Sequence, residues 1–133
     1  MPEPPQSTSL DQTLGFDGYE REGEELARGR MEVVDEVRQP FGIVHGGAMA
    51  SLAESVTSRA TYETVGPEMI AMGMSNETKF LRPVSDGVVE AVARARHRGR
   101  TTWIWDVEIS DDAGRLCALS RMTIAVRPLV RET

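Results

Sequence analysis

The sequence of 133 residues contains one cysteine, Cys117, and two histidines. A single cysteine cannot close an intrachain disulfide, and with two histidines it cannot complete the usual tetrahedral zinc shell. Cys117 is expected in mid-strand as a small core residue rather than a nucleophile, because no histidine lies at a recognisable spacing. No segment approaches the roughly 20 apolar residues of a membrane span, and residues 1–10 hold no apolar signal-peptide core. We therefore expect a cytoplasmic protein.

Aromatic residues make up only 5% of the chain, so its core must be built from Val, Ile, Leu, Met and Ala. The 15 basic and 21 acidic residues give a formal net charge of -6. This balance argues against nucleic acid or an anionic membrane as the main partner, because both attract basic surfaces. The length fits one domain, and a domain this small gains stability from oligomerisation.

Hydrophobic periodicity predicts one long helix and several strands. Apolar residues recur every three to four positions from about Gly46 to Thr64, and Gly66-Pro67 ends this helix. Alternating patterns predict extended structure over 19–38 (with a hairpin turn at 22–24), 69–81, 88–98, 101–109 and 116–126. Residues 1–13 are expected to form a loose lead-in, and 14–128 a single domain. The predicted class is α+β, with the helix packed on an antiparallel sheet.

Two groups of strand residues are assigned to packing. Alanines at 91, 93 and 95 fall on one side of their strand and indicate that the helix lies close to the sheet there. Trp103 and Trp105 share a face of the next strand, where packing against the core is favoured over stacking on an acyl group.

The segment 44–48 (Val-His-Gly-Gly-Ala) lies where a loop becomes the predicted helix. The first helical N–H groups lack partners within the helix, and their positive partial charge suits a carbonyl oxygen that becomes negative during a reaction. The other interpretation is a helix start whose glycines allow tight packing, with His45 as a cap or core residue. On the glycines alone, this second interpretation is favoured.

Glu54 lies in a stretch of the helix that is otherwise small or apolar. A period of 3.6 residues places it in one row with Ser58, with Thr57 and Thr61 flanking that row. A carboxylate on such a face is costly unless it is paired or protonated, which favours acid–base or nucleophilic work. The alternative is that Glu54 simply faces water.

The joint pattern of Gln39-Pro40-Phe41-Gly42, His45-Gly46-Gly47, Glu54 and Ser58 resembles the hotdog-fold acyl-CoA thioesterases. The group it resembles most is the phenylacetic-acid-degradation type, which includes aryl-CoA and hydroxybenzoyl-CoA thioesterases. The resemblance runs from about residue 14 to 127 and continues through Asn76, the stretch 80–84 (Phe-Leu-Arg-Pro-Val) and the stretch 97–100 (His-Arg-Gly-Arg).

The resemblance implies a long central helix wrapped by a curved antiparallel sheet of five to six strands. It also implies a homodimer whose active sites are shared between two protomers, with dimers pairing into tetramers. The activity implied is hydrolysis of acyl-CoA, with Glu54 as nucleophile or general base and the Gly46 N–H polarising the thioester carbonyl. No metal or cofactor is implied, since coenzyme A belongs to the substrate. The catalytic residues implied are Glu54, Gly46, Gln39 and His45, and the substrate-binding residues expected are Gly47, Thr57, Ser58, Asn76, Arg82, Gly99, Arg100 and Thr101.

The basic stretch from Arg94 to Arg100 has three interpretations. It could bind nucleic acid, form a solvated outer strand face, or hold the phosphates of coenzyme A, which suit the planar guanidinium group. A different class of function also stays open, namely an acyl-CoA binding or sensing module without catalysis. The presence of Glu54 favours the enzyme, and the sequence offers no pattern that matches a hotdog dehydratase or hydratase.

Overall fold

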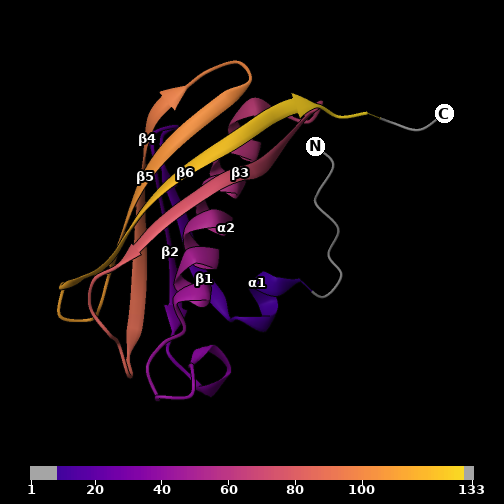
Figure 1. Ribbon diagram of the computed structural model, residues 1–133. Helices are drawn as coiled ribbons and strands as arrows, with labels where there is room; N and C mark the ends of the chain where they lie inside the picture. Colours follow the sequence, from indigo (N-terminus) through magenta and orange to yellow (C-terminus); the bar gives the residue numbers. More distant parts are fainter. Residues whose placement is uncertain (1–8, 131–133) are drawn as a thin grey trace.

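The computed structural model describes residues 9–130 and shows a long helix, α2, embraced by a curved sheet (Figure 1). The elements in chain order are α1 (Leu10–Thr13), β1 (Phe16–Glu22), β2 (Leu26–Glu32), a 3-10 helix (Asp35–Val37), α2 (Gly46–Val65), β3 (Met69–Phe80), β4 (Val88–Arg98), β5 (Thr102–Ser110) and β6 (Leu116–Pro128). This confirms the predicted α+β class with a long helix on an antiparallel sheet.

The six strands form one antiparallel sheet in the order β1-β2-β4-β5-β6-β3. β1 and β3 are its two edges, so each has one side without a strand partner within the chain. Figure 1 shows α2 lying against one face of the sheet, with β6 and β3 passing diagonally across it. Over residues 9–130, α2 and the other helices are too short or too polar to cross a bilayer.

The helix packs closely on the sheet because small residues lie beneath it. Gly29 of β2 pairs with Ala91 of β4, and Ala91 and Ala93 are fully buried. A Cβ atom built on Gly29 would lie only 2.6 Å from Cγ2 of Val56 on α2. The expected role of the alanines is confirmed at 91 and 93, whereas Ala95 is only partly buried beside a bulge in β4. Close helix packing therefore depends on β2 and β4 together.

The two tryptophans pack into the core, as expected. Trp103 and Trp105 stack with their ring centroids 5.9 Å apart, and both are buried. The indole N–H of Trp105 donates to Oγ1 of Thr61 on α2 at 2.9 Å. This buried hydrogen bond fixes the rotation of the helix on the sheet, because only one side of α2 presents Thr61 to β5.

The predicted lead-in is corrected in its last part. Residues 1–8 lie outside the described residues, but Leu10–Thr13 form the helix α1, whose N-cap Ser9 accepts a hydrogen bond from the Gln12 N–H. Asp11 then accepts a hydrogen bond from Ser55 of α2 at 2.6 Å. A capped turn that bonds to the central helix belongs to the folded domain.

The extended segment predicted over 19–38 is also corrected at both ends. It is a hairpin that begins earlier, at Phe16, and turns near Gly23, whose φ of 65° favours glycine. β2 ends at Glu32, and the chain then forms the 3-10 helix. Val37 provides the reason, since it is 1% exposed and the 3-10 helix turns its side chain into the core. The other predicted strands and the long helix agree with the structure to within two residues at each end.

The contact between Gly29 and Val56 predicts a cost for any side chain at position 29. Gly29→Ala should lower the free energy of unfolding by about 1–3 kcal/mol, because the added methyl group overpacks the helix–sheet contact. Urea denaturation measures this change. Combining it with Val56→Ala should recover part of the loss relative to Val56→Ala alone, and a Gly29→Ala protein as stable as the parent would contradict the close packing.

Candidate active site

The loop before α2 is fixed to the fold at several points. Its turn is closed by hydrogen bonds from the Gln39 N–H to the Ile43 carbonyl and from the Gly42 N–H to the Gln39 carbonyl. The side-chain Oε1 of Gln39 accepts a further bond from the Phe41 N–H. The Val44 N–H donates to the Val84 carbonyl at 2.7 Å, which ties the end of the loop to the segment after β3. The loop is thus held ready to present groups at the start of α2.

His45 is the N-cap of α2. Its Nδ1 accepts a hydrogen bond from the Gly47 N–H at 2.8 Å, so neutral His45 carries its proton on the exposed Nε2. Gly46 is the first helical residue, and its N–H has no acceptor within the helix. A Cβ atom on Gly46 would lie 2.9 Å from the Phe80 ring. Glycine here therefore allows Phe80 to form an apolar wall beside a polarised N–H group.

Glu54 lies on the exposed side of α2 and leans toward β3. Its Oε1 accepts a hydrogen bond from Asn76 Nδ2 at 3.3 Å. Its Oε2 is near Gly73, where a Cβ atom would come within 2.8 Å of it. Ser58, one turn later, is half-buried on the same side of the helix. The expectation that Glu54 and Ser58 share a face is confirmed.

Thr57 requires a correction. It is fully buried, and its hydroxyl donates to the Ala53 carbonyl at 2.8 Å. Thr61 is equally buried, and it donates to the Thr57 carbonyl and accepts from Trp105. Thr57 faces the sheet because a step of three residues turns a helical position by about 300° and carries it past the edge of the Glu54 face. Thr61 is held against the sheet by its bond with Trp105 of β5. Thr57 is therefore a core residue and does not line the surface that carries Glu54.

One chain does not bring Glu54 to the start of its own helix. Glu54 follows Gly46 by eight residues, which at 1.5 Å per residue is about 12 Å along the axis. Reacting atoms must approach to about 3 Å. The Glu54 carboxylate points sideways to Asn76 rather than back toward Gly46. The two groups therefore cannot act on the same carbonyl within one chain.

The residues expected near the nucleotide also lie apart in one chain. The Arg82 N–H donates to the Cys117 carbonyl, at the start of β6. The Thr101 carbonyl accepts from the Val126 N–H, near the end of β6. These two points are about 30 Å apart along the strand. Gly99 and Arg100 belong to the same β4–β5 turn as Thr101, so that turn and Arg82 mark opposite ends of the sheet.

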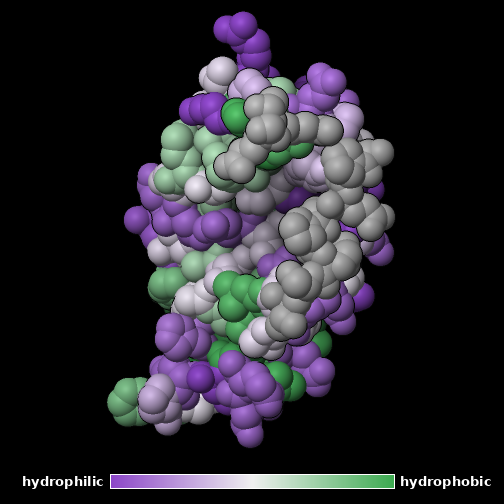
Figure 2. Space-filling model, turned by 90° about the vertical axis from the view of Figure 1, so that its right-hand side faces the viewer, coloured by the Kyte–Doolittle hydropathy of each residue, from purple (hydrophilic) through white to green (hydrophobic). Residues whose placement is uncertain are grey.

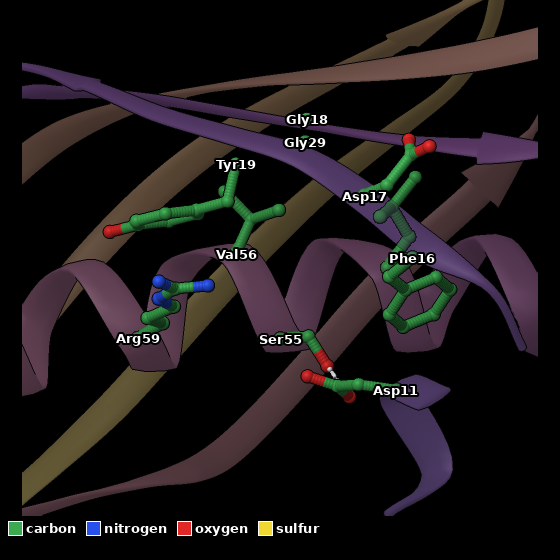
Figure 3. Close-up of a pocket in the computed structure, with 10 residues that line it drawn as sticks. Asp11, Phe16, Asp17, Gly18, Tyr19, Gly29, Ser55, Val56 and Arg59 are labelled. Atoms are coloured by element: carbon green, nitrogen blue, oxygen red, sulfur yellow. Dashed lines mark hydrogen bonds between the residues drawn. The ribbon is translucent and has the colours of Figure 1, made fainter. Parts of the chain in front are cut away.

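A cavity of about 290 Å³ lies between β1 and α2 (Figure 3). It is on the side of the helix that faces away from Glu54. Figure 3 shows the Arg59 guanidinium beneath the Tyr19 ring and the hydrogen bond from Ser55 to Asp11 across the other part of the cavity. The apolar part of the lining comes from Phe16, Tyr19, Leu52 and Val56. The cavity thus combines an apolar floor with a cation and two carboxylates, those of Asp11 and Asp17.

A polar network holds β1 against the second half of α2. The Tyr19 hydroxyl donates to Glu63 at 2.8 Å, and Arg59 lies 3.9 Å from the centroid of the Tyr19 ring. Arg21 donates to Thr64 at 2.7 Å and pairs with Glu63 at 3.6 Å. Burial, together with the Glu63 carboxylate, raises the pKa of Tyr19 above its usual value. Tyr19 therefore keeps its proton, and its bond to Glu63, to a higher pH than an ordinary tyrosine would.

Cys117 is a core residue, as expected. It is 0% exposed, and its thiol donates to the Arg115 carbonyl at 3.2 Å. Burial raises the pKa of the thiol, which disfavours the nucleophilic thiolate. Among residues 9–130, no cluster of three His, Cys, Asp or Glu side chains is placed to hold a metal ion.

The family model of the thioesterase superfamily matches residues 41–118, more than half of the chain. The match spans the helix, the Glu54 face and β3 to β5. Together with the fold and the relatives described next, it shows that this chain belongs to the thioesterase superfamily and is a thioester hydrolase with the hotdog fold.

The chain is similar to curated relatives over most of its length. It is 38% identical to the proofreading thioesterase EntH of Cronobacter turicensis, over 89% of this chain and 85% of the relative. It is 36% identical to the 1,4-dihydroxy-2-naphthoyl-CoA hydrolase of Escherichia coli, over 81% and 79% respectively. The crystal structure of a mutant of thioesterase PA1618 from Pseudomonas aeruginosa matches with a TM-score of 0.88 and 39% identity, over 93% of this chain and 89% of that one.

Some residues around Glu54 and the cavity were not predicted from the sequence. Gly73, Thr78 and Ser120 lie around Glu54 and Asn76, and Arg59 and Tyr19 line the cavity. Gly73 gave a usable signal, because a glycine inside a strand often marks a bulge or a close approach. The structure has a bulge in β3 between Gly73 and Ser75. The other four gave no signal, since their roles depend on contacts across the sheet.

Proposed function

We propose that the protein hydrolyses acyl-CoA thioesters, with aromatic or medium-length acyl groups, to the free acid and coenzyme A. The observation that carries this proposal is the position of Glu54, an exposed carboxylate held on α2 by β3. The similarity to a 1,4-dihydroxy-2-naphthoyl-CoA hydrolase supports an aromatic acyl-CoA as substrate, and the similarity to a proofreading thioesterase supports thioester hydrolysis in general.

Each active site combines two protomers in this proposal. Glu54 comes from one, and the loop from Gln39 to Gly47 comes from its partner. The separation of about 12 Å between Glu54 and Gly46 along one helix supports this arrangement. β3 offers a free edge, with Met72 and Met74 48% and 55% exposed, on which a second copy can extend the sheet. Pairs of such dimers then form a tetramer.

The Gly46 N–H donates to the thioester carbonyl and stabilises the oxyanion, while Gln39 and His45 position the thioester. Two routes use Glu54. In one, its carboxylate attacks the carbonyl carbon, the coenzyme A thiolate leaves, and water hydrolyses the resulting anhydride. In the other, Glu54 takes a proton from a water molecule that attacks the carbonyl directly. Because a thiolate is a good leaving group, neither route needs a metal or an organic cofactor.

The acyl group lies in this proposal along the side of α2 that carries Glu54, because the reacting carbon must approach that carboxylate. Ser58, one turn after Glu54, contacts the acyl group or holds the attacking water there. The cavity between β1 and α2 is a separate feature, because its helix residues lie about 100–200° around α2 from Glu54. Thr57 and Thr61 are excluded from the acyl site by their burial.

The phosphates of coenzyme A bind to arginines at the sheet ends. Arg82 and Arg100 are exposed, and Gly99 and Thr101 flank Arg100 in the β4–β5 turn. Arg98, by contrast, pairs with both Glu24 and Glu25. The two exposed arginines are about 30 Å apart in one chain, so one nucleotide would meet them only where two chains combine.

A second candidate function is a module that binds acyl-CoA without hydrolysing it. It would share the fold and the ligand. Release of free thiol from a panel of benzoyl-, phenylacetyl-, hydroxynaphthoyl- and straight-chain acyl-CoA separates the two functions. Binding without thiol release would favour the second.

Replacing Glu54 by alanine tests the catalytic carboxylate. Glu54→Ala should lower kcat by at least about 100-fold, because it removes the base or nucleophile. The rate is measured by thiol release from the best acyl-CoA of the panel, with circular dichroism to confirm folding. Near-normal hydrolysis by this variant would disprove the assignment.

Mixing two inactive variants tests the shared site. Glu54→Ala and Gln39→Ala chains should each be weakly active alone. If they are refolded together in equal amounts, half of the dimers combine both chains, and each of these holds one intact site. Activity should then recover to about a quarter of the wild-type value. No recovery, despite heterodimers detected by mass spectrometry, would place both residues in a site within one chain.

A further inference from the structure

A continuous chain of hydrogen bonds leads from Glu54 across the sheet to β6. Asn76 Nδ2 donates to Glu54 Oε1 at 3.3 Å and to the Ala50 carbonyl at 2.9 Å. Thr78 Oγ1 donates to Asn76 Oδ1 at 2.6 Å. Thr78 Oγ1 also lies 2.9 Å from Ser120 Oγ on the neighbouring strand. Three side chains from β3 and β6 are thus linked to the Glu54 carboxylate.

The donors and acceptors among these groups permit only one direction for this series of hydrogen bonds. The Ala50 carbonyl only accepts, so the amide nitrogen of Asn76 must face α2 and its oxygen must face Thr78. That oxygen only accepts too, so Thr78 gives it the single hydroxyl proton. Ser120 must then donate to Thr78. Ser120 is 5% exposed, which keeps water from competing for this bond.

Asn76 has little capacity left for substrate. Its two amide protons serve Glu54 and Ala50, and its oxygen already accepts from Thr78. A contact in which Asn76 donates to the substrate, as the sequence allowed, would require one of its two amide bonds to break, whereas its oxygen could accept one further bond. The Ala50 bond also ties the amide to the helix one turn before Glu54, so the donor and the carboxylate keep their relative position.

Gly73 provides the space for this arrangement. The bulge between Gly73 and Ser75 interrupts the regular pairing of β3 with β6. A Cβ atom on Gly73 would lie 2.8 Å from Glu54 Oε2, closer than a side chain permits. The carboxylate is therefore confined between a residue without a side chain and an oriented amide donor.

We propose that Asn76 is a positioning residue for Glu54, held in orientation by Thr78 and Ser120. The inference rests on the proposed function, in which Glu54 reacts with the thioester or its attacking water. Asn76 fixes which oxygen of Glu54 faces the reacting carbon and leaves Oε2 for the reaction. Its contribution is to the rate of the chemical step and not to substrate affinity.

Steady-state kinetics of four variants test the proposal. Asn76→Ala should lower kcat by about 10- to 100-fold, the range for a lost hydrogen bond to a charged group, with KM nearly unchanged. Thr78→Val, which is isosteric and lies outside the substrate contacts proposed above, should lower kcat by about three- to tenfold. Thr78→Ser restores the hydroxyl and should restore the rate. Thr123→Val makes the same chemical change on the outer face of β6 and should leave kcat unchanged.

The fold loss in kcat should be the same for an aromatic and a straight-chain acyl-CoA, because a positioning residue does not touch the acyl group. A rise in KM with kcat unchanged would overturn the proposal and make Asn76 a substrate contact. A Thr78→Val protein with wild-type kcat would overturn the role of Thr78 and Ser120 in orienting Asn76. Thermal unfolding of each variant separates these results from a loss of fold.

The failure of this inference is distinct from that of the proposed function. If the wild-type protein releases no thiol, or if Glu54→Ala retains the wild-type rate, the proposed function fails and the inference fails with it. If the wild type is active and Glu54→Ala is not, unchanged kcat values in the Asn76 and Thr78 variants overturn the positioning role alone.

Discussion

The close contact between α2 and the sheet is the constraint on which the site depends. Small residues on β2 and β4 let the helix approach until Val56 touches the backbone of Gly29. The bond from Trp105 to Thr61 fixes the rotation of the helix about its axis. With that rotation set, Glu54 must emerge at the border of the helix that faces β3. The position of the carboxylate that we propose to react thus follows from the packing of Val56 on the opposite side of the helix.

β3 serves both the sheet and the site because it is an edge strand. On one side it pairs with β6 along most of its length, and on the other it has free backbone groups. At its bulge the regular pairing of β3 with β6 is interrupted, and Glu54 lies in the space beside Gly73. Bulges often occur where a strand must redirect a side chain, and here the redirected contact lies across the sheet–helix interface. A dimer formed through this edge would place a second copy close to Glu54.

The main elements could be predicted from the sequence because they depend on local patterns of apolar residues and breakers. The helix from Gly46, the strands after it and the shared face of Glu54 and Ser58 follow from periodicity. The roles proposed for Glu54 and Ser58 follow from the resemblance to a family and not from periodicity. Thr57 was misplaced because a polar side chain at the border of a helix face can turn either way. Its hydroxyl bonds to the Ala53 carbonyl, which lets it enter the core without an unpaired donor. The α1 turn was missed because it depends on Asp11 meeting Ser55, 44 residues later.

For a polyanionic substrate, the positions of the unpaired arginines matter more than the net charge of -6. Several arginines of the outer sheet face are paired with acids: Arg28 with Glu22 and Glu90, Arg96 and Arg121 with Asp106, and Arg98 with Glu24 and Glu25. Exposed pairs of this kind add little stability, but they neutralise that face. In the proposed function, attraction for the phosphates of coenzyme A then depends on individual arginines at the ends of the sheet. Such attraction would be short in range at physiological salt, so it would select a ligand already near the site rather than any passing polyanion.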